Sequence, residues 1–420
     1  MKPFTFVHAA DLHIGSPFKG VSASSASLAA ALRDATLQAF QNIVALCIDR
    51  KVDFLVVAGD IYDGADRSIA AQLAFLDGLT ELAKHGIRTF VAYGNHDPLD
   101  GWASSIDWPE QVKIFGNRVE SELFLKDGEP VANIAGISYQ TGSESRNLAR
   151  LFAGCLDSRH PGLYSLAILH CNVAGESAHA NYAPCSLSDL QDCGFDYWAL
   201  GHVHERKVLY RKPYVVYPGN AQGRNIRESG ARGCYLVSVQ ADCTADLDFV
   251  ATDKIRFGRG KVAIDGMNSL SELDRALAKE MEKLRADSEG RPVLCRIELS
   301  GRGQLYHEIS QDDELEDLLE RCRQKCEHER PFCWVEELEL SCRPEMNLAE
   351  ARKRDDLLGS VLREADEMRQ SNLEGEISAM LKSLYGHAGA KVALSRPEKE
   401  EWQRLLEEAE MLCVDLLESG

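Results

Sequence analysis

The chain has 420 residues, and its 66 acidic and 47 basic side chains give a formal net charge of −19 at neutral pH. Such an acidic balance argues against a protein that coats nucleic acid or an acidic membrane through its overall charge. Hydrophobic residues make up 45% of the chain, which suffices for a large core and excludes bulk disorder. The length corresponds to about two to four domains.

The 13 cysteines are scattered, odd in number and without a CxxC pair. This pattern is typical of reduced thiols rather than of a disulfide framework or a zinc knuckle. The N-terminal apolar run meets a charge at Asp11 and lacks the features of a signal peptide. No apolar run approaches the roughly 18 residues of a membrane helix. We therefore expect a cytoplasmic protein with no membrane partner.

Short apolar runs alternate with helical patterns through the first hundred residues. The patterns predict strands over Phe4–Ala10, Phe54–Ala58 and Arg88–Ala92, and helices over Ala26–Arg50 and Ile69–His85. This alternation is typical of parallel βαβ units. In such sheets the chemistry lies just beyond the carboxyl ends of the strands.

Further strands are predicted over residues 131–137, 166–169, 198–200, 214–217 and 235–239. Few helical patterns separate the last of these, so we expect a second, partly antiparallel sheet. The predicted fold of residues 1–255 is therefore an α/β sandwich of two sheets flanked by helices.

After residue 255 the pattern changes. Strands at 261–264, 293–299 and 332–340, with helices beginning near Ser269 and Asp312, predict a small α+β domain over residues 256–345. Residues 346–420 are charge-rich, carry leucines at helical spacing and are predicted to form helices. From the residues alone, these helices are either a local packing unit or a surface on which a partner docks.

Polar motifs follow the predicted strands in a fixed order: Asp11-x-His13, Gly59-Asp60-x-x-Asp63, Gly94-Asn95-His96-Asp97, His170 and Gly201-His202-Val203-His204. A single buried histidine is usually an ordinary core residue, but five such elements at strand ends indicate a metal site. Carboxylate, imidazole and amide ligands together suit Mn²⁺, Fe²⁺ or Zn²⁺. Asp60 could bridge two ions about 3.5–4 Å apart, because a carboxylate offers two oxygens.

As a set, these motifs resemble the calcineurin-like metallophosphoesterase superfamily over residues 4–239. By position, the resemblance implies one ion held by Asp11, His13, Asp60 and His204, and another held by Asp60, Asn95, His170 and His202. It also implies that His96 is the general acid or stabilises developing charge. Asp63 and Asp97 match positions that orient loops and histidines, although ordinary turn or cap aspartates are an equal alternative. The ions are expected to be Mn²⁺, with Fe²⁺, Mg²⁺ or Zn²⁺ as alternatives.

Within the superfamily, the motifs around Asp11 and Asp60 are similar to those of SbcD-type DNA repair exonucleases. The segment Tyr217-Pro218-Gly219-Asn220, followed by Gly223-Arg224, is most similar to that of bacterial YhaO-type members. The resemblance implies a DNA-capping domain after about residue 260, terminal helices that bind an SbcC-like coiled-coil ATPase, and a homodimer. Asp63 is a departure, because some nucleases of the group have a histidine there that is thought to assist catalysis.

Cations gather just after His204, where residues 205–232 have a local balance of +5. The seven cations are Arg206, Lys207, Arg211, Lys212, Arg224, Arg227 and Arg232. Such side chains neutralise phosphates without regard to sequence, and we predict that Arg206, Lys207, Arg224 and Arg227 bind DNA. The alternative is a solvated loop.

The sequence thus predicts a two-metal phosphodiesterase that acts as an exonuclease on DNA ends in repair, with a metal-bridging hydroxide as nucleophile. One alternative is a phosphatase or phosphodiesterase for a small molecule, a nucleotide or a phosphoprotein, since the metal site would be shared. The other is a mainly structural DNA-binding component of an ATPase complex.

Overall fold

The computed structural model describes residues 1–16, 18, 26–63, 68–101, 106–158, 162–173, 181–326, 330–370 and 399–418. These residues form two compact units. The first comprises Met1–Gly260, Ala278–Ile297 and Leu319–Leu338, and the second comprises Lys261–Leu277, Glu298–Leu318 and Glu339–Gly420. Within the described ranges, no helix combines the length and apolar character that a membrane span requires.

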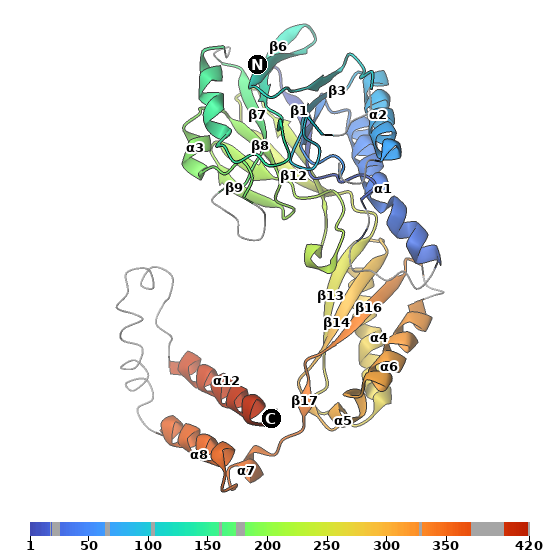
Figure 1. Cartoon of the computed structure of the whole chain (residues 1–420), viewed down its shortest axis with the longest axis vertical. Coiled ribbons are helices and arrows are strands. Elements are labelled where there is room, and N and C mark those ends of the chain that lie inside the picture. The colour runs from blue at the N-terminus through green and yellow to red at the C-terminus, as the bar shows by residue number, and fades with distance from the viewer. Residues whose placement is uncertain are drawn as a thin grey trace. The chain divides into compact units, whose positions relative to one another are not determined.

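A six-stranded sheet of described residues has the order β12-β11-β1-β2-β3-β4 (Figure 1). Its strands are β1 (Phe4–Ala9), β2 (Phe54–Ala58), β3 (Arg88–Ala92), β4 (Val112–Ile114), β11 (Gly233–Val239) and β12 (Ala245–Ala251). Strands β1 to β4 run parallel, whereas β11 is antiparallel to both β1 and β12. Helices α1 (Ala26–Arg50) and α2 (Ile69–Lys84) cover the outer face of this sheet.

The second six-stranded sheet, again among described residues, has the order β5-β6-β7-β8-β10-β9. Its strands are β5 (Glu120–Lys126), β6 (Glu129–Gly136), β7 (Tyr164–His170), β8 (Tyr197–Gly201), β9 (Lys207–Arg211) and β10 (Tyr214–Tyr217). The four central strands are parallel, and the edge strands β5 and β9 are antiparallel to their neighbours. The 3₁₀ segment η2 (Ala149–Ser158) and helix α3 (Leu187–Gln191) pack on its outer face, where Phe152 meets Trp198 edge to face.

An aromatic core joins the two sheets. Strand β2 shows how it forms, because all five of its side chains are buried. Successive side chains of a strand point to opposite faces, so Phe54 lies between the sheets and Leu55 packs toward α1 and α2. The rings of Phe6 and Phe54 stack with centroids 5.1 Å apart, and Tyr197 of the second sheet meets Phe6 edge to face. The two sheets and their flanking helices confirm the predicted α/β sandwich.

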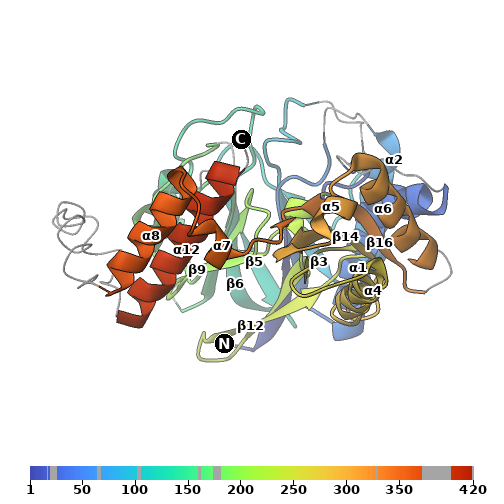
Figure 2. The ribbon, with the colours of Figure 1, turned by 90° about the horizontal axis from the view of Figure 1, so that it is seen from below.

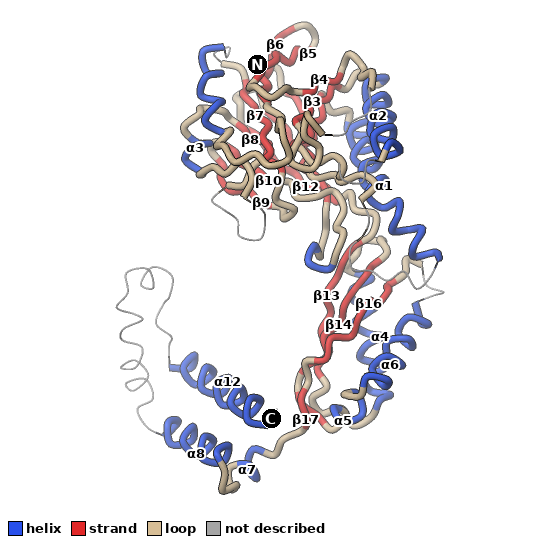
Figure 3. Tube along the Cα trace, in the orientation of Figure 1, coloured by secondary structure: helices blue, strands red, loops and turns tan. Residues whose placement is uncertain are grey.

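The elements after residue 255 alternate between strand and helix (Figure 3). They are β13 (Arg256–Ala263), α4 (Leu270–Ala286), β14 (Val293–Ser300), β15 (Arg302–Gly303), α5 (Tyr306–Ile309), α6 (Asp312–Cys326), β16 (Cys333–Leu340) and β17 (Arg343–Pro344). Strands β13, β14 and β16 form one sheet, and β15 pairs with β17. The predicted boundaries at residues 255 and 345 stay predictions.

Three described helices follow: α7 (Leu348–Ala351), α8 (Leu357–Gln370) and α12 (Lys399–Glu418). Helices α8 and α12 lie side by side in both views (Figures 1 and 2). Leu362 and Val414 are fully buried in their contact. The Arg352 guanidinium reaches Glu410 at 2.8 Å, so an ion pair with a buried acid reinforces the apolar contact.

Candidate metal centre

The polar motifs lie at the carboxyl ends of strands from both sheets. Asp11 follows β1, Asp60 follows β2 and Asn95 follows β3 in the first sheet. In the second sheet, His170 ends β7 and His202 follows β8. Because parallel neighbours end at the same edge of a sheet, residues far apart in sequence converge there.

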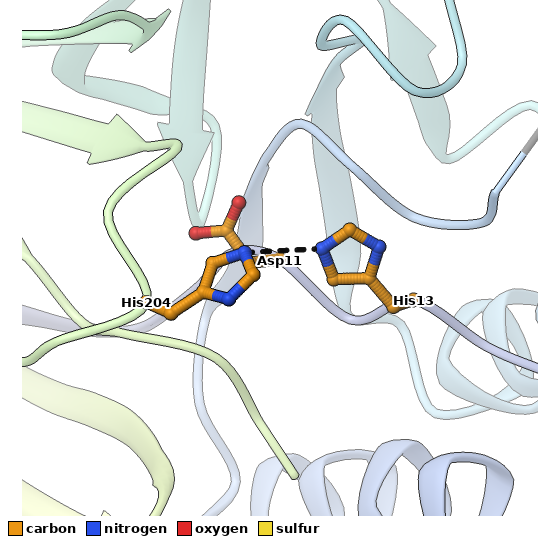
Figure 4. Close-up of side chains that lie close together, drawn as sticks. All are labelled: Asp11, His13 and His204. Carbon is orange, nitrogen blue, oxygen red and sulfur yellow. Dashed lines mark hydrogen bonds between the residues drawn. The ribbon is translucent and has the colours of Figure 1, made fainter. Parts of the chain in front are cut away.

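Asp11, His13 and His204 form the first cluster, in which ligand atoms of all three lie within 4.8 Å of one another. Figure 4 shows the two imidazole rings turned toward each other beside the Asp11 carboxylate. The Nε2 atoms of His13 and His204 are 3.3 Å apart. Two ring nitrogens and a carboxylate oxygen that converge in this way suit a divalent cation.

Asp11, Asp60 and His170 form the second cluster, again within 4.8 Å. The Nε2 atom of His170 lies 3.4 Å from Asp60 Oδ2 and 3.0 Å from Asn95 Oδ1. The ring of His202 lies beside that of His170, with centroids 5.2 Å apart. The same Asp60 oxygen is 4.0 Å from His13 Nε2, so this carboxylate of the second cluster also faces the first.

The ionisable side chains at the centre form an environment that suits a bound cation. Asp11 and Asp60 are both buried, and burial together with the Asp60 charge raises the pKa of Asp11 well above its ordinary value. Burial alone would also raise the pKa of Asp60, but His170 and His13 outweigh it and bring that pKa to about 2. Burial lowers the pKa of His13 to about 4, which leaves a neutral imidazole suited to metal binding. Two buried carboxylates among neutral imidazoles call for divalent cations.

The backbone at four of these positions lies in the left-handed region. The φ angles are 50° at Asp11, 44° at His13, 54° at Asp60 and 103° at His202. Residues with a Cβ atom rarely adopt this region, and each costs about 1–3 kcal/mol. Such strained backbone conformations persist only where the surrounding structure holds them in place. Here they direct the side chains of these four residues into one site.

Glycines allow the strands to approach closely enough to form the centre. A Cβ atom at Gly59 would overlap the His170 ring, and one at Gly94 would overlap the Asp60 carboxylate. At Gly201 it would overlap the carbonyl oxygen of Ala58 on β2 of the other sheet. These glycines are therefore part of the site, since any side chain would displace a ligand or separate the sheets.

Gly201→Ala is expected to destabilise the protein by about 1–3 kcal/mol, the usual cost of overpacking a core, because the two sheets would have to move apart. Gly116→Ala is the matched control, since its Cβ would meet only the flexible end of Glu120, at 2.7 Å from Oε1. Urea unfolding of both variants measures the difference. Equal stabilities would contradict the close approach at Gly201.

Comparisons with known proteins agree with this fold. The calcineurin-like phosphoesterase family matches residues 4–206, and the middle domain of metallophosphoesterase YhaO matches residues 257–343. The uncharacterized metallophosphoesterase YhaO of Bacillus subtilis is 32% identical over 97% of this chain and 96% of its own length. The chain belongs to the YhaO family of metallophosphoesterases.

More distant relatives carry nuclease names. The SbcD component of the Escherichia coli nuclease SbcCD is 22% identical over 90% of this metallophosphoesterase and 98% of its own length. The DNA double-strand break repair protein Mre11 of Methanopyrus kandleri is 23% identical over 74% of this chain and 73% of its own. The predicted relationship to calcineurin-like, YhaO-type and SbcD-like proteins is confirmed.

A hydrogen bond from the Nδ1 atom fixes the orientation of each of three candidate ligand histidines. The Nδ1 atoms of His13, His170 and His204 bond to Asp63 Oδ1 at 3.1 Å, the Ala58 carbonyl at 2.9 Å and Glu228 Oε1 at 2.7 Å. Each bond leaves the Nε2 atom of its histidine directed into the centre. Partners of this kind set the tautomer and the basicity of a metal-binding histidine.

Asp63 and Asp97 tie the motifs together. Asp97 accepts the backbone N–H groups of Gly94 at 2.7 Å and of Ile61 at 2.6 Å, which fixes the β2 loop to the β3 loop. Burial and the Asp60 charge raise the pKa of Asp97 to about 7. Asp63 contacts His96 as well as His13, at 2.6 Å from the His96 Nδ1 atom. These contacts suit the predicted role of both aspartates in orienting loops and histidines.

Glu228 follows Gly223-Arg224 in the segment that resembles SbcD-type proteins, but the sequence alone assigned it no role in the site. It bonds His204, accepts the Asn220 side-chain amide at 3.0 Å and accepts the Arg224 backbone N–H at 2.7 Å. Burial alone would raise its pKa, but the interactions with His204 and Arg224 together outweigh burial and bring the pKa to about 2. It lies 24 residues beyond its histidine, and its one local signal is its place after the Gly223-Arg224 segment.

Glu228→Gln is expected to lower metal affinity about 10- to 100-fold, the usual effect of removing a carboxylate behind a ligating histidine. The amide keeps the shape of the side chain but lacks the charge that orients His204. Metal titration of the apo-protein measures the change, with the neighbouring, exposed Glu205→Gln as control. Unchanged affinity in Glu228→Gln would contradict this role.

The predicted DNA-binding residues fall into two groups. Arg224 lies at the centre, where its Nη1 atom bonds Asp63 at 3.2 Å. Arg206 lies over the Phe249 ring, 3.8 Å from its centroid, and Lys207 pairs with Glu205 at 3.1 Å. Arg227 is exposed. The structure thus brings Arg224 to the metal ligands and leaves the other three outside that group.

Proposed function

We propose that this metallophosphoesterase is a two-metal phosphodiesterase that degrades DNA from its ends. The observation that carries the proposal is the pair of ligand clusters, which share Asp11 and are linked by the contacts of Asp60 with His13 and His170. One ion would be held by Asp11, His13, Asp60 and His204, and the other by Asp60, Asn95, His170 and His202. When bound, such ions neutralise charge on the phosphate and generate a nucleophile near neutral pH.

His96 would act as the general acid. Its side chain is 45% exposed, so substrate can reach it, and its Nδ1 atom is 2.6 Å from Asp63 Oδ1. That contact leaves Nε2 as the nitrogen that faces a substrate. Protonated at Nε2, His96 would donate its proton to the departing sugar oxygen.

Arg224 is the best-placed residue for a phosphate contact. Its Nη1 atom bonds Asp63, which also bonds His13, so the guanidinium is held beside the candidate metal ligands. A guanidinium there suits a phosphate group, which it can bind with two parallel bonds. Arg206, Lys207 and Arg227 would contact the strand farther from the scissile bond.

DNA is favoured as substrate by the nuclease and DNA-repair names of the distant relatives and by the added segments beyond residue 255. The donor set suits Mn²⁺, which we propose as the native metal. We further propose that residues 256–345 cap the DNA, that two copies dimerise and that an SbcC-like ATPase docks on the terminal helices. Leu412 and Leu416, spaced one turn apart on α12, are 58% and 69% exposed and suit such a contact.

Digestion of end-labelled duplex and single-stranded DNA with Mn²⁺, beside a chelated sample, tests the proposal. Stepwise shortening from the labelled ends with Mn²⁺ alone is the expected result. Turnover of a small phosphodiester without cleavage of DNA would instead establish the small-molecule alternative. Cleavage only in the presence of a coiled-coil ATPase would favour the alternative of a mainly structural component.

A further inference from the structure

His8 is a buried histidine that the proposed reaction does not use. It lies on β1, three residues before Asp11, and none of its surface is exposed. Successive side chains of a strand alternate between faces, so His8 points between the two sheets together with Phe4 and Phe6. A buried polar ring costs free energy unless its nitrogens are hydrogen-bonded, so its partners indicate what it does.

Both ring nitrogens of His8 bond to strand β8 of the other sheet. The Nε2 atom is 3.2 Å from the carbonyl oxygen of Leu200, and the Nδ1 atom is 3.0 Å from the Tyr197 hydroxyl. A carbonyl oxygen can only accept, so Nε2–H donates to Leu200 and Nδ1 accepts the Tyr197 O–H. Burial lowers the pKa of His8 to about 3 and raises the pKa of Tyr197, so the ring stays neutral and the hydroxyl keeps its proton. The two bonds therefore hold one tautomer of His8 in one orientation.

These bonds tie the two sheets together beside the metal centre. Strand β1 belongs to the first sheet and β8 to the second. Just beyond His8 and Leu200, both carboxylate oxygens of Asp11 accept the backbone N–H of His202, at 3.0 and 3.1 Å. Two successive ties thus join β1 to β8, the first at the end of the core and the second within the centre.

The backbone that leads from β8 into the centre is tightly constrained. Gly201 separates Leu200 from His202, and a Cβ atom at Gly201 would overlap the Ala58 carbonyl oxygen. His202 itself has a φ of 103°, which a residue with a Cβ atom keeps only where neighbouring contacts hold it. The bond from His8 to the Leu200 carbonyl is such a contact, because it fixes the peptide that leads into this turn.

We propose that His8 is a positioning residue of the metal centre, which ties strand β8 to strand β1 and so sets the place of His202 relative to Asp11. It acts through the backbone of β8 and touches neither substrate nor metal. The inference rests on the ligand sets of the proposed function, in which Asp11 and His202 hold different ions. A shift of β8 against β1 would therefore change the distance between the two ligand sets.

Calorimetric titration of the metal-free full chain with Mn²⁺ tests His8. His8→Leu removes both cross-sheet bonds and should weaken Mn²⁺ binding about tenfold, the lower end of the usual loss for residues behind a metal ligand. His8→Gln keeps an N–H group that can reach the Leu200 carbonyl, so it should restore most of that affinity. Phe6→Leu is the matched control, because Phe6 lies on the same face of β1 and packs against Tyr197 without a polar atom. It should lower the urea midpoint of unfolding but bind Mn²⁺ like the wild type.

Tyr197→Phe is the mildest change, since it removes one hydroxyl and keeps the ring. The His8 ring then loses the donor that fixes its tautomer, so Mn²⁺ affinity should fall about two- to fivefold. Wild-type affinity in both His8→Leu and Tyr197→Phe, an equal loss of affinity in Phe6→Leu, or no recovery in His8→Gln would each overturn the inference. A wild-type chain that binds no Mn²⁺ would instead refute the ligand sets of the proposed function, and this inference with them.

Discussion

Asp60→Asn is expected to remove bound metal and to lower phosphodiester hydrolysis by more than about 100-fold. This loss would exceed the one caused by removing a residue that only hydrogen-bonds a metal ligand. One Asp60 oxygen accepts the His96 backbone N–H at 2.9 Å, and the other faces His170 at 3.4 Å and His13 at 4.0 Å. The oxygen of an amide can still accept the His96 N–H, but its NH₂ group has no lone pair to offer a metal ion. The substitution also removes a negative charge from the second cluster.

Metal content by plasma mass spectrometry and turnover of a phosphodiester measure the two effects separately. Asp77→Asn, an exposed aspartate on α2, makes the same chemical change outside the site and should behave as wild type. Two ions per chain and unimpaired turnover in Asp60→Asn would refute the ligand assignment. Loss of both together, with normal unfolding, is the result that the geometry requires.

The parts of the fold that follow from the sequence are those with a strong local pattern. Strand β2 (Phe54–Ala58), strand β3 (Arg88–Ala92) and helix α1 (Ala26–Arg50) have the predicted bounds. Strands that are buried on both faces read as continuous apolar runs, and a long helix shows its apolar spacing over several turns. The bounds of these strands and this helix can therefore be predicted from their own residues.

The missed elements lack such a pattern. Edge strands β5 (Glu120–Lys126), β9 (Lys207–Arg211) and β12 (Ala245–Ala251) carry charged or exposed residues between apolar ones. They form because a neighbouring strand offers backbone hydrogen-bond partners, and a short stretch of sequence does not reveal that neighbour. Helix α3 is short, and the Ser186–Asp189 capping box at its start is its main local signal.

The candidate site divides in the same way. Its candidate ligands lie in short motifs at strand ends, so the order of the motifs indicated a metal site, and the family resemblance implied which residues would be ligands. Glu228 and the glycine at 201 act through contacts between segments distant in sequence, with His204 and with the Ala58 carbonyl. Local charge likewise could not separate Arg224, which reaches the centre, from Arg206, which lies over Phe249.

His96→Ala is expected to keep its metal and to lose about 10²- to 10⁴-fold in turnover of DNA, the range of a well-placed general acid. Its ring forms a third group of possible ligands with His13 and Asp63, but it is not among the residues assigned to either ion, and its backbone N–H bond to Asp60 survives the change. Burial lowers the pKa of His96, but the Asp63 hydrogen bond and the Asp60 charge outweigh burial and raise it. The side chain should therefore hold a proton for the leaving oxygen.

A leaving group that needs no proton separates acid catalysis from a general loss of the site. The sugar oxygen of DNA departs as a strong base and requires a proton, whereas p-nitrophenolate departs without one. His96→Ala should therefore lose far more turnover on DNA than on bis-p-nitrophenyl phosphate, at unchanged metal content. Equal losses on both substrates would contradict proton donation by His96 and would assign it to charge stabilisation, since that effect acts on the phosphate whatever group departs.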